Sequence, residues 1–180
     1  MANAEQIWMV RMDETPLGHL DLFFSAQGLT ALEITAAEDD MSFIIPGLTH
    51  SDGEEEAPSK VIHWINDTIG NLERFFQGLP LSLDDVPLDL RGTPFQLRIW
   101  QELCKIPFGE TVSYQDLARR LGKPQAARAV GQACGRNPIP LIVPCHRVIA
   151  ANSSLGGFSA GLDRKRWLLE HEKKQITRKK

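Results

Sequence analysis

The stretch IWMVRMDETPLGHLDLFFSAQGLTALEI, residues 7–34, decides the fold of the first part of this 180-residue chain. It holds three short apolar segments, separated at Thr15-Pro16-Leu17-Gly18 and at Ala26-Gln27-Gly28, which have the composition of turns. We therefore predict a small antiparallel sheet. Beyond it, residues 46–58 carry Pro, Gly, Asp and a run of Glu, and we expect an exposed loop there.

Apolar residues further along recur at helical spacing and predict a helix that ends at Gly78. They are Val61, Trp64, Ile65, Ile69, Leu72, Phe75 and Phe76. A linker that contains proline is predicted from Leu79 to about Gly92, and we place the domain boundary within it. The first domain, residues 1–90, would then contain the sheet and this helix, and residues 91–180 would form a second domain.

The second half is predicted to be mainly helical, so the chain as a whole belongs to the mixed α/β (α+β) class. One helix is expected over residues 94–105, followed by a β-prone piece at residues 111–113. A helix over residues 114–121 and another that begins at Pro124 are separated by a short turn containing Gly122. Such a pair predicts a helix-turn-helix, although many helix pairs in all-helical cores have the same pattern.

The charge is distributed unevenly along the chain. Residues 1–90 hold 3 Lys/Arg against 17 Asp/Glu, whereas residues 91–180 hold 17 against 6. Part of this basic excess lies in the tail, residues 173–180. A basic half on an acidic protein indicates a polyanionic partner such as nucleic acid, and an unevenly charged surface is the alternative.

Other features limit the class of protein. No apolar run approaches the roughly 18 residues of a membrane span, and the start MANAEQIW lacks the pattern of a secretory signal. The three cysteines, Cys104, Cys134 and Cys145, form no CxxC pair or zinc-site spacing. We therefore expect reduced thiols, a cytoplasmic protein (nuclear in a eukaryote), and no metal or cofactor. A monomer is expected because no coiled coil or apolar interface is legible in the sequence.

The stretch NPIPLIVPCHRV, residues 137–148, carries a candidate nucleophile. A free cysteine has a pKa near roughly 8.5, so Cys145 needs a base or cation nearby, and His146 and Arg147 are both candidates. Neighbours on a strand point to opposite faces, so the backbone must turn or a water must bridge Cys145 and His146. The prolines favour an irregular backbone.

Two alternatives remain open at this point. Cys145 could be an inert, buried cysteine at the end of a core strand. If it is reactive, a carboxylate on the last helix could orient His146, and spacing does not choose between Glu170 and Glu172.

These residues resemble the O6-alkylguanine-DNA alkyltransferases. The signature is Pro144-Cys145-His146-Arg147-Val148, and further motifs occur in the family's order: Thr93-Pro94-Phe95-Gln96, Ile106-Pro107-Phe108-Gly109-Glu110-Thr111, Ser113-Tyr114, Ala126-Ala127-Arg128-Ala129-Val130-Gly131, Asn137-Pro138 and Trp167-Leu168-Leu169. The resemblance covers about residues 90–173 strongly and the N-terminal part in outline. It implies a ribonuclease H-like first domain and a winged-helix-like second domain.

The resemblance implies DNA repair by direct reversal of damage. O6-alkylguanine, with O4-alkylthymine as a further candidate, would be flipped out of the duplex, and its alkyl group would pass irreversibly to Cys145. His146 would take the thiol proton through a water. Glu172 would orient His146, because the family places its acid five residues after Trp167. Tyr114 would donate its hydroxyl to the guanine ring.

The resemblance also implies roles in binding. Asn137 would brace the turn before the active segment, and Arg128 would fill the gap that the flipped base leaves. The remaining implied DNA contacts are Tyr114, Gln115, Ala126, Ala127 and Gly131, in the minor groove of double-stranded DNA. Pro140, Val148 and Ser159 would line the guanine pocket. Some eukaryotic members hold zinc near their N-terminus, but no cysteine precedes Cys104 here, so we expect none.

Three other functions compete with alkyl transfer. A non-catalytic lesion binder would have the nucleophile replaced, and Cys145 is intact. A transcription regulator would read the major groove through the helix-turn-helix and would not need Cys145. A Cys-His hydrolase would turn over and would need no basic domain.

Overall fold

The computed structural model describes residues 5–35, 57–81 and 86–178. The chain divides into two compact units, Met1–Gln77 with Ser82–Leu90 and Gly78–Leu81 with Arg91–Lys180. Within the described ranges, no helix is long and apolar enough to cross a membrane.

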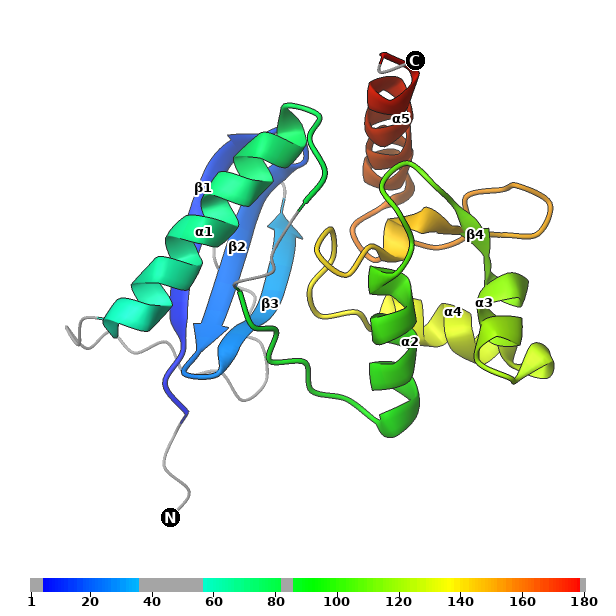
Figure 1. The fold of residues 1–180 in the computed structure, drawn as a ribbon, viewed down its shortest axis with the longest axis horizontal. Helices are drawn as coiled ribbons and strands as arrows, with labels where there is room; N and C mark the ends of the chain where they lie inside the picture. Colours follow the sequence, from blue (N-terminus) through cyan, green and yellow to red (C-terminus); the bar gives the residue numbers. More distant parts are fainter. Residues whose placement is uncertain (1–4, 36–56, 82–85, 179–180) are drawn as a thin grey trace. The chain divides into compact units, whose positions relative to one another are not determined.

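The first unit contains a three-stranded antiparallel sheet with the strand order β1-β2-β3 (Figure 1). Strand β1 spans Trp8–Thr15, β2 spans Gly18–Ser25 and β3 spans Gly28–Thr35. This confirms the sheet that was predicted from the apolar segments. Both connections are short, and each returning strand begins at a glycine with positive φ. Glycine adopts this conformation without the steric cost that a side chain would add.

Helix α1, Ser59–Phe76, lies across one face of this sheet (Figure 1). The fully buried side chains of Leu72 and Phe75 belong to the core that the central strand supplies with Leu20, Leu22 and Phe24. This confirms the helix that was predicted from the spacing of its apolar residues. The loop predicted for residues 46–58 lies almost entirely outside the described residues.

The segment after α1 is not the simple linker that the sequence predicted. Leu29 of β3 donates its amide to Pro87 O at 2.9 Å and accepts from the amide of Asp89 at 2.9 Å. Residues near Leu88 therefore pair with the edge of β3, where unpaired backbone groups would otherwise remain. The approach is so close that a Cβ on Gly28 would lie 2.1 Å from Pro87 O.

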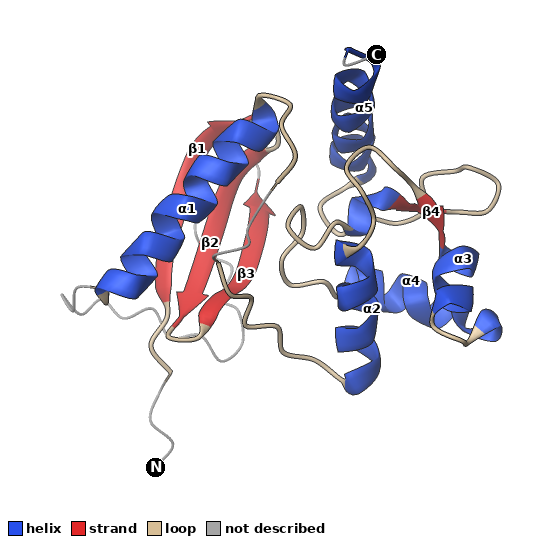
Figure 2. Cartoon of the chain, in the orientation of Figure 1, coloured by secondary structure: helices blue, strands red, loops and turns tan. Residues whose placement is uncertain are grey.

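The second unit is mainly helical, with a short parallel pair of strands, as Figure 2 shows. Its elements are α2 (Pro94–Cys104), β4 (Val112–Ser113), α3 (Tyr114–Arg120), α4 (Ala127–Gly135), β5 (Val148–Ile149) and α5 (Leu162–Arg178). Helix α2 begins with a capping box in which Thr93 and Gln96 exchange hydrogen bonds. The mixed α/β class is confirmed.

Helices α3 and α4 pack against each other and form the predicted helix pair. Gly122 ends the first helix with a φ of 69°. Pro124 begins a 3-10 turn, Pro124–Ala126, and the α-helix starts only at Ala127. The predicted start was therefore three residues too early. Trp100 of α2 donates its indole N–H to Ala133 O of α4 at 3.0 Å, which ties these two helices together.

Candidate active site

The segment that carries Cys145 is irregular, as its prolines predicted. Turns and bends replace regular structure from residue 137 to residue 144, and Leu141 has a φ of 70°. A 3-10 turn, Cys145–Arg147, follows and leads into β5. Cys145 is buried, as the alternative of a structural cysteine expected, but it does not end a core strand, because strand β5 comes after it.

Asn137 holds this segment in place from inside the unit. Its side-chain amide donates to Val143 O at 2.7 Å and to Cys145 Sγ at 3.2 Å. Its side-chain oxygen accepts the amide of Ile139 at 3.1 Å. One buried side chain thus makes hydrogen bonds to three groups of a loop that lacks regular backbone hydrogen bonding, and one of these groups is the sulfur of the candidate nucleophile.

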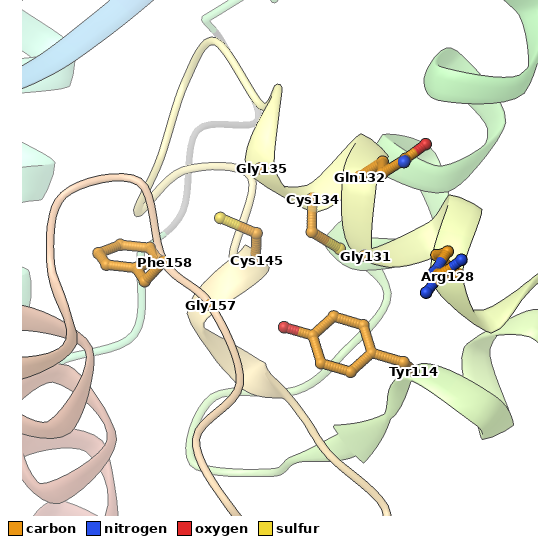
Figure 3. A pocket seen from close by; sticks show the side chains of 9 residues that line it. All are labelled: Tyr114, Arg128, Gly131, Gln132, Cys134, Gly135, Cys145, Gly157 and Phe158. Atoms are coloured by element: carbon orange, nitrogen blue, oxygen red, sulfur yellow. The ribbon is translucent and has the colours of Figure 1, made fainter.

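Cys145 lies in a pocket of about 360 Å³, which Figure 3 shows. Tyr114, Arg128 and Gly131, each predicted from the resemblance, line the pocket with it. Its other lining residues were not predicted: Gln132, Cys134, Gly135, Gly157 and Phe158. The tyrosine hydroxyl is directed toward the side of the pocket where Cys145 and Phe158 lie (Figure 3).

The three residues expected to line a guanine pocket do not line this one. Pro140 and Val148 are buried, and Ser159 is exposed. The carbonyl of Val148 accepts a hydrogen bond from Lys165 Nζ at 2.6 Å. The backbone around residues 148–159 nevertheless contributes to the pocket through Gly157 and Phe158.

Behind Cys145, a buried carboxylate joins three parts of the unit. Glu172 of α5 lies 2.9 Å from His146 Nε2 and accepts three N–H contacts of 3.0 to 3.2 Å from Arg147. Its second oxygen also accepts the amide of Gly109 at 2.8 Å. The side chains of His146 and Glu172 are fully buried. The acid that contacts His146 is thus Glu172, whereas Glu170 is exposed.

The charges of this cluster follow from its contacts. Burial alone would raise the pKa of Glu172, but hydrogen bonds and charge from His146 and Arg147 lower it to about 2. Burial lowers the pKa of His146, and this exceeds the opposing effect of Glu172. His146 is then neutral near pH 7, so at that pH it contributes a hydrogen bond to Glu172, and Arg147 contributes the charge. A carboxylate only accepts hydrogen bonds, so the imidazole proton is assigned to Nε2.

This assignment leaves Nδ1 of His146 as the basic nitrogen. The atom is buried and has no hydrogen-bond partner among the described residues. Burial raises the pKa of the Cys145 thiol, although the Asn137 hydrogen bond and the charge of Lys165 oppose this. The thiol is therefore protonated at rest and requires a base before it can attack.

Lys165 is a fully buried cation that the sequence did not single out. Its ammonium donates to Val148 O at 2.6 Å and Gly157 O at 3.1 Å, and lies 5.9 Å from the centre of the Tyr114 ring. Burial raises the pKa of Tyr114 to about 12, so its hydroxyl remains a donor near neutral pH. A basic residue amid charged neighbours on α5 gave no signal that it would be buried.

The residues expected to contact DNA belong to helices α3 and α4 and to the 3-10 turn between them. Arg128 is exposed, and Ala126 and Ala127 are partly exposed. Gln115 donates its side-chain amide to Pro124 O at 2.6 Å, so it also ties α3 to the turn before α4. In the described part of the chain, no group of three or more His, Cys, Asp or Glu could hold a metal ion.

The site combines a cysteine thiol in a pocket with a buried His146–Glu172–Arg147 cluster, in a basic unit that contains a pair of helices. Residues 94–174 match the family model described as 6-O-methylguanine DNA methyltransferase, DNA binding domain. A methylated-DNA--protein-cysteine methyltransferase of Salmonella typhimurium is 40% identical over 159 residues, 88% of this chain and 91% of that protein. The chain belongs to the methylated-DNA--protein-cysteine methyltransferase family.

Two further comparisons agree. The methylated-DNA--protein-cysteine methyltransferase of Mycobacterium tuberculosis is 52% identical over 122 residues, 64% of this chain and 73% of that protein. The crystal structure of the OGT of that organism in complex with DNA is 41% identical and covers 92% of each chain with a TM-score of 0.72.

Proposed function

We propose that this protein repairs alkylated DNA by moving an alkyl group from the O6 atom of guanine to Cys145. The observation that carries the proposal is a cysteine thiol in a pocket, with a buried histidine, a buried glutamate and an arginine arranged behind it. Membership of the family and the DNA complex of the mycobacterial relative support DNA as the partner.

The proposed step is an in-line displacement at the alkyl carbon. The bond from sulfur to carbon forms as the bond from carbon to guanine O6 breaks, and the electron pair of that bond goes to guanine. His146 takes the thiol proton at Nδ1 through a bridging water. Tyr114 donates a hydrogen bond to the departing base and disperses its charge. A thioether has no ready leaving group, so each molecule acts once.

The pocket explains why the base must leave the stack. Cys145 is 4% exposed, so its sulfur cannot reach a guanine within a duplex. Extruding a base costs a few kcal/mol, and a weakened pair costs less. Arg128, exposed on α4 at the pocket, would fill the gap, and the small residues Ala126, Ala127 and Gly131 would let that helix approach the minor groove.

Several finer assignments belong to this proposal. The unit that contains the sheet would be ribonuclease H-like, and the helical unit winged-helix-like, with domains at residues 1–90 and 91–180. Pro140, Val148 and Ser159 would complete the recognition of guanine once the base is bound. The protein would act as a monomer in the cytoplasm, or in the nucleus of a eukaryote.

The test is the intact mass of the protein after mixing with excess duplex that carries one O6-methylguanine. We expect a gain of one methyl group, located on Cys145 by peptide mapping. Cys145→Ala should show no gain, whereas Cys134→Ala, which removes the other thiol of the pocket, should retain it. Tight binding to the lesion without transfer would indicate a damage sensor. Neither transfer nor preference for the lesion would leave a helix-turn-helix DNA binder.

A further inference from the structure

Arg147 makes more contacts around the candidate site than the proposed reaction requires. Its Nε and Nη2 atoms donate to Glu172 at 3.0 to 3.2 Å, and its Nη1 atom donates to Ile106 O at 2.6 Å. Its guanidinium also lies 5.8 Å from the centre of the Phe108 ring. This side chain is almost entirely buried, yet neither its charge nor its fork of donors is needed to bind the alkyl group or the sulfur.

The need for this cation comes from the burial of the pair that it contacts. Glu172 and His146 are fully buried and lie 2.9 Å apart. A lone buried carboxylate is strongly disfavoured, and an adjacent imidazole would normally take a proton to compensate for it. A protonated imidazole cannot accept the proton of Cys145. A second cation on the carboxylate removes this conflict.

We infer that Arg147 is a positioning residue: it is the counter-ion of Glu172, and by holding that charge it adds to the effect of burial in keeping His146 neutral, with the proton on Nε2 and a bare Nδ1. The inference rests on the proposed alkyl transfer, for which it supplies the state of the base. Arg147 acts through Glu172 and His146 and does not touch the reacting atoms.

The geometry suits arginine and no other residue. The planar fork contacts both carboxylate oxygens, and its remaining donor reaches Ile106, in the same turn whose Gly109 amide also contacts Glu172. Lysine would keep the charge but could not make these contacts together. Arg147 therefore links the turn after α2 and helix α5 to its own 3-10 turn through one carboxylate.

The other charged and titratable groups around the pair do not replace Arg147. Lys165 of α5 also acts on His146 and on Cys145, but its ammonium is bound to the carbonyls of Val148 and Gly157. Cys104 of α2 experiences the charge of Arg147, and burial raises the pKa of its thiol, so it stays neutral. Arg147 is thus the cation in direct contact with Glu172.

The test is the rate of a single turnover against pH, from about pH 5 to pH 9, with saturating duplex that carries one O6-methylguanine. In the wild type, the rate should fall only below the ordinary imidazole range. In Arg147→Gln, His146 should protonate about one pH unit higher, so the ratio of variant to wild-type rate should rise with pH, by up to about tenfold over the whole range from about pH 5 to pH 9. Arg147→Lys should keep the wild-type midpoint with a lower plateau.

Arg11→Gln is the matched control. Arg11, which belongs to the other unit, also donates two hydrogen bonds, of 2.6 and 2.7 Å, to a buried carboxylate, that of Asp21. The control variant should leave both midpoint and plateau unchanged. Parallel pH profiles for wild type and Arg147→Gln would overturn the inference while the proposed function stands. No methyl uptake by the wild type at any pH would instead count against the proposed function.

A second measurement covers the case in which Arg147→Gln does not fold. Nitrogen NMR of histidine-labelled wild type and Arg147→Lys, with His146→Gln to assign the signal, should show a neutral ring with its proton on Nε2 at pH 7. An imidazolium in the wild type at that pH would overturn the inference.

Discussion

Tyr114 shows how a single side chain can be tuned by its surroundings. A Cβ on Gly156 would lie 2.8 Å from its hydroxyl oxygen, whereas a Cβ on Gly131 would lie 3.7 Å from its ring, which is an ordinary van der Waals contact. Gly156 thus leaves room for the ring beside Cys145. Burial is the main cause that raises its pKa to about 12, and the nearby thiols Cys134 and Cys145 act in the same direction.

We expect Tyr114→Phe to slow methyl transfer on the order of a hundredfold while lesion binding changes little, because one donor to the departing base is lost. Single-turnover rates and equilibrium binding measured on the same duplex separate the two effects. Since Tyr114 is the only tyrosine of the chain, ultraviolet titration of the protein reports its hydroxyl directly. A half-ionised tyrosine at pH 10, or transfer at the wild-type rate in Tyr114→Phe, would contradict this role.

At the residue scale, sequence reasoning found groups with recognisable chemistry. Cys145, His146 and Asn137 lie in one short motif, and a cysteine next to a histidine in the sequence indicates a nucleophile with a candidate base. Phe158, Cys134 and Lys165 were missed, since their place depends on how the loop after β5 and helices α4 and α5 pack. Choosing Glu172 over Glu170 needed the resemblance, because both are acidic residues of one helix.

At the scale of elements, the turn between α2 and β4 connects the fold to the site. Gly109 has a φ of 75° and donates its amide to Glu172. A Cβ there would lie 2.0 Å from Ile176 Cδ1 and 3.4 Å from the Glu172 carbonyl oxygen. Helix α5 can therefore approach the turn closely only because residue 109 is glycine.

We expect Gly109→Ala to lower the free energy of unfolding by about 1–3 kcal/mol and to slow transfer, because it combines backbone strain with a clash against α5. Gly122→Ala is the matched control for stability, since Gly122 has a φ of 69° but open space around its Cβ. It should lose only about 1 kcal/mol. Urea denaturation of both variants, and of Gly109→Ala with and without Ile176→Ala, measures the clash as a coupling energy.

Equal losses for the two glycine variants, with no coupling to Ile176, would show that α5 does not press on this turn.

The sequence predicted which elements form better than it predicted where they begin and what they pair with. The 3-10 turn at Pro124 and the pairing of Leu88 with β3 both arise from backbone hydrogen bonds to distant or following residues, which apolar periodicity does not register.

At the scale of the whole molecule, the basic excess and the buried charges lie in the same half of the chain. Residues 91–180 hold 17 basic and 6 acidic residues, and the site within them buries two of the basic residues, Arg147 and Lys165, and one of the acidic residues, Glu172. The excess cation is Lys165, close to the sulfur that becomes an anion during transfer. The same burial makes the fold sensitive to acid, because groups held in one ionisation state link folding to pH.

Stability should therefore fall as the pH is lowered from neutral. Glu172 has a pKa of about 2 in the folded chain against 4.5 when free, so its contribution is complete above pH 4.5 and is lost as the pH falls toward 2. The lowered pKa of His146 acts in the same sense from pH 6.5 downward. Glu33 of the first unit, whose pKa burial raises, acts in the opposite sense.

We expect Glu172→Gln to be less stable than the wild type by roughly 3 kcal/mol at pH 7, because Arg147 is then left as an unpaired buried charge. As the pH falls from 4.5 toward 2, this difference should shrink, since the wild type protonates the same carboxyl. Urea denaturation at pH 7, 4.5 and 3 measures both curves, and the contribution of Glu33 cancels between them. A gap that stays constant down to pH 3 would mean that Glu172 is not an ionised partner of Arg147 in the folded protein.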